Sequence, residues 1–170
     1  MKHLFLYPVV LMAALLFSLD LTAAKNDPWK KACTDEKKPE TCRISQVRYI
    51  TKEVDGKQKV VGKALSLTVI YATDAKSGKR TPFMSIQMPL GVDLRAGAVF
   101  RVDKGKEIHV PYLRCTNDGC DASYRLDSGF IKLLKAGKIF YVGVRPWGDS
   151  KSSVFEASLK GFTKAFKALK

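Results

Sequence analysis

Alternating apolar and polar side chains dominate much of the sequence between residues 43 and 159. The clearest stretch is residues 60–73, where every second residue is apolar: Leu65, Leu67, Val69 and Tyr71. A period of two is typical of strands with one buried face. Similar alternation occurs in residues 43–52, 83–88, 98–103, 108–112, 120–126, 138–145 and 154–159. Turn signals separate these segments at intervals of roughly ten residues, so the pattern predicts an all-β sandwich or barrel.

Two segments have the signals of helices instead. Residues 128–136 follow Asp127 or Ser128 as a candidate N-cap and precede Gly137, which predicts a short connecting helix. At the C-terminus, apolar residues recur at helical spacing: Phe162, Ala165, Phe166 and Leu169. Lysines occupy the opposite face: Lys160, Lys164, Lys167 and Lys170. Such a helix either lies on a membrane surface or folds its apolar stripe onto the β domain, and for so short a helix we favour the second arrangement.

Two cysteines bracket the most turn-like part of the chain. Residues 108–112 and 120–126 are the arms of a predicted hairpin, and Asn117-Asp118-Gly119 lies between them. These three residue types tolerate the positive φ angles that tight reversals need. Cys115 and Cys120 then lie on opposite arms, at a separation that a disulfide can span.

The other two cysteines, Cys33 and Cys42, lie in residues 26–42, for which we expect an irregular start pinned by their bond. Because each pair is close in sequence, we predict two local disulfides, Cys33–Cys42 and Cys115–Cys120. Crossed pairings are formally allowed. A structural zinc site is a further alternative, but the usual gap of about two to four residues between ligand cysteines fits only the second pair.

The first 24 residues have the composition of a cleaved signal peptide. Lys2 provides a positive start, a largely apolar run follows, and Thr22-Ala23-Ala24 offers small residues for the peptidase. A membrane anchor is the alternative, but proline, serine and aspartate interrupt the run, and a span needs about 20 apolar residues. We expect cleavage after Ala24, a single domain over residues 25–170, and no transmembrane segment in the mature chain.

The charge of the mature chain indicates the kind of partner. The sequence has 30 Lys and Arg against 16 Asp and Glu, and loss of Lys2 and Asp20 leaves 29 against 15, a net charge of +14. Such an excess attracts anionic partners: acidic polysaccharides, lipid headgroups, nucleic acid or acidic proteins. A simple solvated surface is the alternative, since most lysines lie in scattered turn-like segments. The most concentrated basic group is our candidate site for an anionic ligand: Lys160, Lys164, Lys167 and Lys170.

The sequence lacks patterns for catalysis or metal binding. The mature chain has one histidine, His109, which falls on the outward side of its predicted strand, and no Gly-x-Ser-x-Gly nucleophile motif. Asp118, Asp121 and Asp127 lie near the hairpin but lack the spacing of a calcium-binding EF-hand loop. The sequence has neither a glycine-rich phosphate loop nor a basic-aromatic RNA-binding module. We therefore expect no enzyme activity, no cofactor, no metal site and no specific nucleic-acid partner.

Three blocks of the sequence together have a recognisable order. Residues 29–44 contain Trp29 and the first cysteine pair, residues 85–97 begin with Ser-Ile-Gln-Met-Pro-Leu-Gly-Val, and residues 113–122 contain the second pair. In this order the blocks resemble the invasion-associated locus B family of exported bacterial proteins, as do residues 133–137 and 158–162. The chain departs from the family's pattern just before Trp29, where a Gly-Asp pair is expected.

The resemblance implies an immunoglobulin-like β-sandwich, a location in the periplasm, at the outer membrane or outside the cell, and a role in host-cell entry. Combined with the charge, it favours an exported noncatalytic binding or virulence-accessory protein that acts through a basic surface. The alternative is a periplasmic envelope-maintenance or structural protein whose charge keeps it near anionic lipid or peptidoglycan. The oligomeric state stays open.

Overall fold

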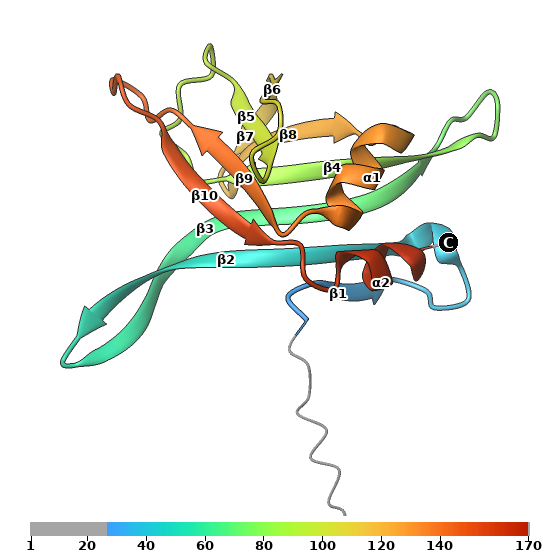
Figure 1. Ribbon diagram of the computed structural model, residues 1–170, viewed down its shortest axis with the longest axis horizontal. Helices are drawn as coiled ribbons and strands as arrows, with labels where there is room; N and C mark the ends of the chain where they lie inside the picture. The colour runs from blue at the N-terminus through green and yellow to red at the C-terminus, as the bar shows by residue number, and fades with distance from the viewer. Residues whose placement is uncertain (1–26, 170) are drawn as a thin grey trace, which may run out of the picture.

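The computed structural model describes residues 27–169, so the predicted signal peptide (1–24) and Lys170 lie outside the described residues. The described chain is mostly β structure with two short helices (Figure 1). Its elements are β1 (Lys30–Cys33), the 3-10 helix η1 (Pro39–Thr41), β2 (Cys42–Val54), β3 (Lys57–Thr73), β4 (Arg80–Met88), β5 (Ala98–Val102), β6 (Ile108–Val110), β7 (Tyr112–Thr116), β8 (Gly119–Arg125), α1 (Ser128–Ala136), β9 (Ile139–Val144), β10 (Ser153–Ser158) and α2 (Phe162–Lys167).

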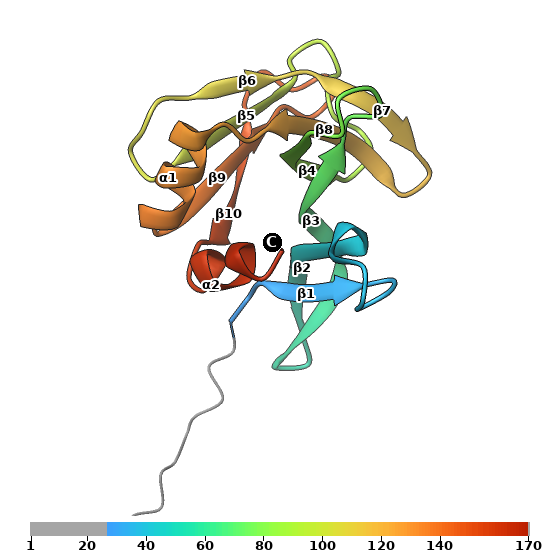
Figure 2. The ribbon, with the colours of Figure 1, turned by 90° about the vertical axis from the view of Figure 1, so that its right-hand side faces the viewer.

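The strands form two antiparallel sheets that share one core. The six-stranded sheet has the order β1-β2-β3-β4-β8-β7, and the four-stranded sheet has the order β10-β9-β5-β6. Ile86 of the first sheet belongs to the same apolar cluster as Phe100 and Phe140 of the second. Figure 2 shows α1 and α2 on the same side of the two sheets. The predicted β-rich architecture with a connecting helix and a C-terminal helix is confirmed at this level.

The predicted alternation places the core side chains as expected. In β3, Leu65, Leu67 and Val69 are fully buried, and in β4 the same holds for Met84 and Ile86. Since these residues alternate with half-exposed neighbours, each strand turns one face to the core.

The start of the chain is more regular than the sequence indicated. Residues 26–42 were expected to be irregular, but Lys30–Cys33 forms β1, which pairs with β2 in the register Lys30↔Ser45 to Cys33↔Cys42. The 3-10 helix η1 follows within the loop. The reason lies in the tertiary structure, because the four residues of β1 form their strand hydrogen bonds with β2. Only Cys33 among them is partly buried. Their own sequence therefore has no apolar alternation that would predict a strand.

The prediction that residues 108–112 form one continuous strand of the hairpin was wrong. Val110 pairs with Ala98 in the four-stranded sheet, whereas Tyr112 pairs with Ala122 in the six-stranded sheet. Pro111 stands between them, and a proline has no N–H to donate to a strand ladder. The chain therefore changes sheets at Pro111, and the shorter arm β7 alone forms the hairpin with β8.

Both predicted disulfides are present. Cys33 is bonded to Cys42 and Cys115 to Cys120, and the described chain has no free cysteine. Cys115 and Cys120 face each other in the β7–β8 register, and Asn117-Asp118 forms the turn. Among the three turn residues named from the sequence, only Gly119 has a positive φ, at 135°. The crossed pairings and the zinc site are thereby excluded, and the bonds indicate an oxidising compartment.

Helix α1 has the boundaries that the sequence predicted. The Asp127 side chain accepts a hydrogen bond from the Phe130 N–H at 2.7 Å, and the Gly137 N–H donates to the Leu133 carbonyl at 2.8 Å. Gly137 has an ordinary φ of −75°, so the helix end does not require a left-handed residue. A Cβ at Gly137 would instead overlap Val102, and the glycine therefore allows the helix to end against β5.

Candidate functional site

The apolar face of the C-terminal helix is docked on the domain. Phe162, Phe166 and Leu169 are almost fully buried, and the Phe162 and Trp29 rings are packed in a T-shaped arrangement with a centroid separation of 5.1 Å. Trp29 is itself held by a hydrogen bond from its indole N–H to the Ser158 carbonyl at 2.9 Å. The arrangement favoured from the sequence, in which the apolar stripe packs on the β domain, is confirmed.

Docking of this face directs the lysines outward. Lys160, Lys164 and Lys167 are exposed, and we call these three residues the lysine ridge. Within the part of the chain that the structure describes, no ridge residue has an acidic partner at ion-pair distance. One carboxylate, that of Asp27, packs against the left-handed Gly161 at the start of α2. The fourth predicted residue, Lys170, lies outside the described residues.

Helix α1 adds a basic residue that the sequence analysis missed. The Lys135 ammonium lies 5.3 Å from the centroid of the Phe166 ring, and the Thr163 hydroxyl donates to the Lys135 carbonyl at 3.3 Å. Lys135 is therefore next to the lysine ridge although it is distant from it in sequence. A basic residue in the last turn of a helix is a common favourable feature, but that signal does not say which other element lies beside it.

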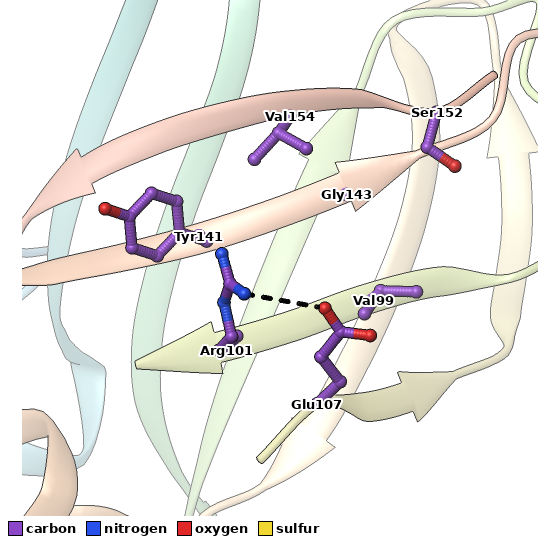
Figure 3. Close-up of a pocket in the computed structure, with 7 residues that line it drawn as sticks. All are labelled: Val99, Arg101, Glu107, Tyr141, Gly143, Ser152 and Val154. Carbon is purple, nitrogen blue, oxygen red and sulfur yellow. Dashed lines mark ion pairs between the residues drawn. The ribbon is translucent and has the colours of Figure 1, made fainter. Parts of the chain in front are cut away.

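A second candidate area is a shallow groove of about 130 Å³ on the outer side of the four-stranded sheet (Figure 3). Gly143 forms part of its floor, because the missing side chain leaves space between the cross-strand neighbours Val99 and Val154. Arg101 and Tyr141 lie at one end, with Glu107 opposite the guanidinium. The groove therefore combines a cation, an aromatic ring and a carboxylate.

The charges of the groove are largely compensated within the protein. The Arg101 guanidinium lies 4.8 Å from the Tyr141 ring centroid and 3.7 Å from the Glu107 carboxylate. Arg145, which lines an adjoining pocket, donates to the Asp93 carboxylate at 2.9 Å. Because these guanidinium groups already have anionic or aromatic partners, the lysine ridge is the better site for an external anion.

Asp93 is the buried carboxylate that organises the neighbouring loop. It accepts from the Arg95 guanidinium at 3.2 Å and the Arg95 backbone N–H at 3.1 Å, in addition to Arg145. The hydrogen bond from the Arg95 side chain holds the pKa of Asp93 below its ordinary value of 3.8; burial opposes this shift, and the other donors support it. Folding therefore favours the charged form of Asp93.

We expect Asp93→Asn to lower the melting temperature at neutral pH and to lower it less in acid. A carboxylate with a depressed folded-state pKa contributes stability above about pH 3.8, and that contribution is lost as the pH falls through the lower folded-state value. Thermal unfolding from pH 7 downward measures the difference between variant and parent. Asp118→Asn, at an exposed turn position, is the control and should change little at any pH. A difference in melting temperature between Asp93→Asn and the parent that grew in acid would contradict the prediction.

The remaining candidate residues of the sequence analysis do not converge. His109 is exposed on β6, as expected. Asp121 pairs with Arg114 at 3.3 Å, Asp127 caps α1, and Asp118 lies in the exposed turn. No group of three metal-ligating side chains occurs among residues 27–169.

In the same described range, none of the helices combines the length and apolar character needed to cross a membrane.

Comparisons with known proteins agree on one family. The family described as "Invasion associated locus B (IalB) protein" matches residues 29–170. Two curated relatives, invasion protein B homologues of Brucella abortus strain 2308 and of Brucella abortus biovar 1 strain 9-941, are each 32% identical over 75 residues. Those matches cover 44% of this chain and 43% of each relative, so the chain spans less than half the length of the curated relatives that it matches.

A solved structure supports the fold. The crystal structure of invasion associated protein B from Bartonella henselae superposes with a TM-score of 0.61 and covers 84% of this chain and 91% of its own. Its sequence is 18% identical, so this similarity concerns the arrangement of the backbone.

Proposed function

This chain belongs to the invasion associated locus B family, and we propose that it is an exported, noncatalytic binding protein that holds an anionic ligand on its lysine ridge. The ligand class is an anionic group of the bacterial envelope or of a host-cell surface: a lipid headgroup, an acidic polysaccharide or an acidic protein. The proposal concerns this domain alone.

The observation that carries the proposal is the combination of a docked helix and unpaired lysines. Phe162 and Phe166 anchor α2 in the core, so the ridge lysines project from a fixed backbone instead of a mobile tail. Groups that are already positioned lose less conformational entropy when a ligand binds. With a net charge of +14 on the whole chain, long-range attraction of an anion acts in the same direction.

The noncatalytic part of the proposal is a prediction, and the chemistry of the groove on the four-stranded sheet supports it. The groove in Figure 3 has a volume of about 130 Å³ and contains neither a nucleophile beside a base nor a free cation. His109 is exposed and outside that groove's lining. A hydrolase or transferase needs a nucleophile and a base within hydrogen-bond reach. Among the described residues, the hydroxyl–carboxylate contact of this kind is the one from Ser77 to Asp74 at 2.8 Å, which lies in an exposed turn outside the groove.

The cellular setting follows from the family and from the disulfides. We propose a periplasmic, outer-membrane-associated or secreted protein with a role in host-cell entry, because the family name refers to invasion and the two bonds fit an oxidising compartment. We also propose that the two antiparallel sheets form a variant of the immunoglobulin-like sandwich, in support of which both sheets contribute to one core.

We expect the combined change of Lys160, Lys164, Lys167 and Lys170 to glutamine to weaken binding of heparin about tenfold or more at low salt, with an unchanged melting temperature. Glutamine has a helix propensity similar to that of lysine and removes the charge. The heparin affinities of the variant and the parent should converge as the salt concentration rises, since screening reduces the contribution of exposed charges.

A matched control separates a local site from a general effect of charge. The control carries four other exposed lysines as glutamine and has the same net charge: Lys76, Lys79, Lys104 and Lys106. Heparin binding by this control should stay close to that of the parent. Equal losses in the two variants would show that only total charge matters and would refute the ridge as a site.

A further inference from the structure

The hairpin of β2 and β3 continues past the body of the domain as a two-stranded arm (residues 49–62), whose turn lies at the far lower left of Figure 1. Strand β1 pairs with β2 only from Cys42 to Ser45, and β4 pairs with β3 only from Ser66 to Thr73. Within the described residues, the arm therefore has no neighbouring strand along either edge. Its closing turn is Asp55-Gly56, and both residues have positive φ angles of 53° and 69°.

The arm exposes a concentration of apolar side chains. Five of the twelve large hydrophobic residues that are exposed in the described chain lie on it, each between 38% and 62% exposed: Tyr49, Ile50, Val54, Val60 and Val61. Single exposed apolar residues need no explanation, but a cluster on one projecting element is typical of an interaction surface.

The strand register places basic residues among these apolar ones. Lys52 pairs directly with Lys59, and Val54 pairs with Lys57, so all three lysines share one face of the arm. Glu53 pairs with Gln58 on the opposite face. Among the described residues, the carboxylate at ion-pair distance from these lysines is that of Asp55 in the turn, 3.9 Å from Lys59. Like charges directly across a strand pair are destabilising. An external anion on this face would remove that repulsion.

The structure disfavours two kinds of protein partner for the arm: a strand of another protein added to its edge, and a second copy of this chain. Register shifts between Arg48 and Tyr49 and between Ile50 and Thr51 interrupt the ladder, and bulges together with lysines are features that prevent an edge strand from accepting another strand. A second copy seated on the arm is also disfavoured. One face of two strands over about seven residue pairs covers roughly 200 Å², whereas a stable interface buries about 800 Å² on each partner.

We propose that the arm contacts a lipid bilayer that contains anionic headgroups. Its exposed aliphatic residues reach the boundary between headgroups and acyl chains, and its three lysines bind the phosphates. Apolar residues combined with basic ones are the composition of interfacial segments, and a lysine can keep its ammonium among the headgroups while its methylene stem lies on apolar surface. The ribbon is thin, so side chains of both faces reach lipid. This contact is separate from the lysine ridge and does not rest on it.

The test uses the purified protein with vesicles of phosphatidylcholine that contain phosphatidylglycerol, vesicles of phosphatidylcholine alone, and heparin. A variant with Ile50, Val54, Val60 and Val61 all changed to threonine keeps β propensity and charge. We expect its affinity for the anionic vesicles to fall at least about tenfold and its affinity for heparin to stay unchanged. A loss of heparin binding equal to the loss of vesicle binding would overturn the proposal in favour of a polysaccharide partner.

A spectroscopic reporter locates the contact even if the fourfold variant folds poorly. The tryptophan of Val60→Trp should show an emission shift to shorter wavelength on anionic vesicles, because the arm enters a less polar environment. Val154→Trp is the matched control, since Val154 is also an exposed strand valine, 57% against 62% exposed, and its emission should not shift. Vesicle binding without a shift at Val60→Trp would refute the arm as the contact. Changing the ridge lysines to glutamine should leave the emission shift of Val60→Trp unchanged in vesicle-bound protein. The proposal for the ridge and the proposal for the arm can therefore fail independently, with different results.

Discussion

Replacing Phe162 by alanine is expected to lower the free energy of unfolding by about 4 kcal/mol, the middle of the range for a large buried aromatic residue. Phe162 is fully buried, and its ring contacts Trp29 on one side and Phe166, at a centroid separation of 5.5 Å, on the other. The variant would leave a cavity between the C-terminal helix and the start of the chain. Urea denaturation followed by circular dichroism measures the loss.

The control for this prediction is on the same helix. Lys164→Ala removes an exposed side chain and should change stability by less than about 0.5 kcal/mol. Alanine at Phe166 together with Phe162 should cost more than either change alone. If Phe162→Ala reduced stability by under about 1 kcal/mol, α2 would not be docked in solution, and the lysine ridge would lose the fixed backbone on which the proposed function depends.

Replacing Gly119 by alanine is expected to cost about 3 kcal/mol, from backbone strain and overpacking together. Gly119 has a φ of 135°, which side-chain-bearing residues rarely adopt. A Cβ at this position would also overlap the Met88 carbonyl oxygen of β4. Since Met88 pairs with Cys120, the clash lies where the disulfide-bonded β7–β8 hairpin joins β4 in the six-stranded sheet. Neither backbone can move there without loss of that pairing.

Gly78→Ala separates the two causes. Gly78 also has a positive φ, 67°, but a Cβ there would meet no atom within 4 Å. Its substitution should cost about 1 kcal/mol, the usual penalty of a left-handed residue. Chemical denaturation of both variants provides the comparison. Equal losses in the free energy of unfolding for Gly119→Ala and Gly78→Ala would mean that the predicted overlap with Met88 is relieved at no cost.

The two proposed surfaces differ in what supports them. The lysine ridge is held by the core packing of Phe162 and Phe166, so its geometry depends on the stability of the whole domain. The arm is held mainly by its own strand ladder and turn, so substitutions on it should affect binding with little effect on global unfolding. Stability and binding measured on the same variants therefore distinguish the two surfaces.

Local sequence features determined most of the elements and their buried faces. Leu65, Leu67 and Val69 alternate with polar residues, and a half-buried strand is the structure in which that alternation separates core from solvent. Asp127 determined the start of α1 because its carboxylate satisfies a backbone N–H of the first turn. The spacing of Phe162 and Phe166 indicated which face of α2 would be buried, and the closeness of the cysteines in each pair indicated the disulfides.

Only the tertiary structure decided which elements lie together. Strand β1 has no apolar alternation of its own and depends on hydrogen bonds from β2, and the assignment of β6 and β7 to different sheets depends on partners at Ala98 and Ala122. Lys135 lies beside the lysine ridge only because α1 and α2 pack together. The exposure of the arm depends on where β1 and β4 end. Alternation and capping depend on neighbours along the chain and are visible in the sequence, whereas pairing between distant segments depends on the whole set of buried surfaces and is not.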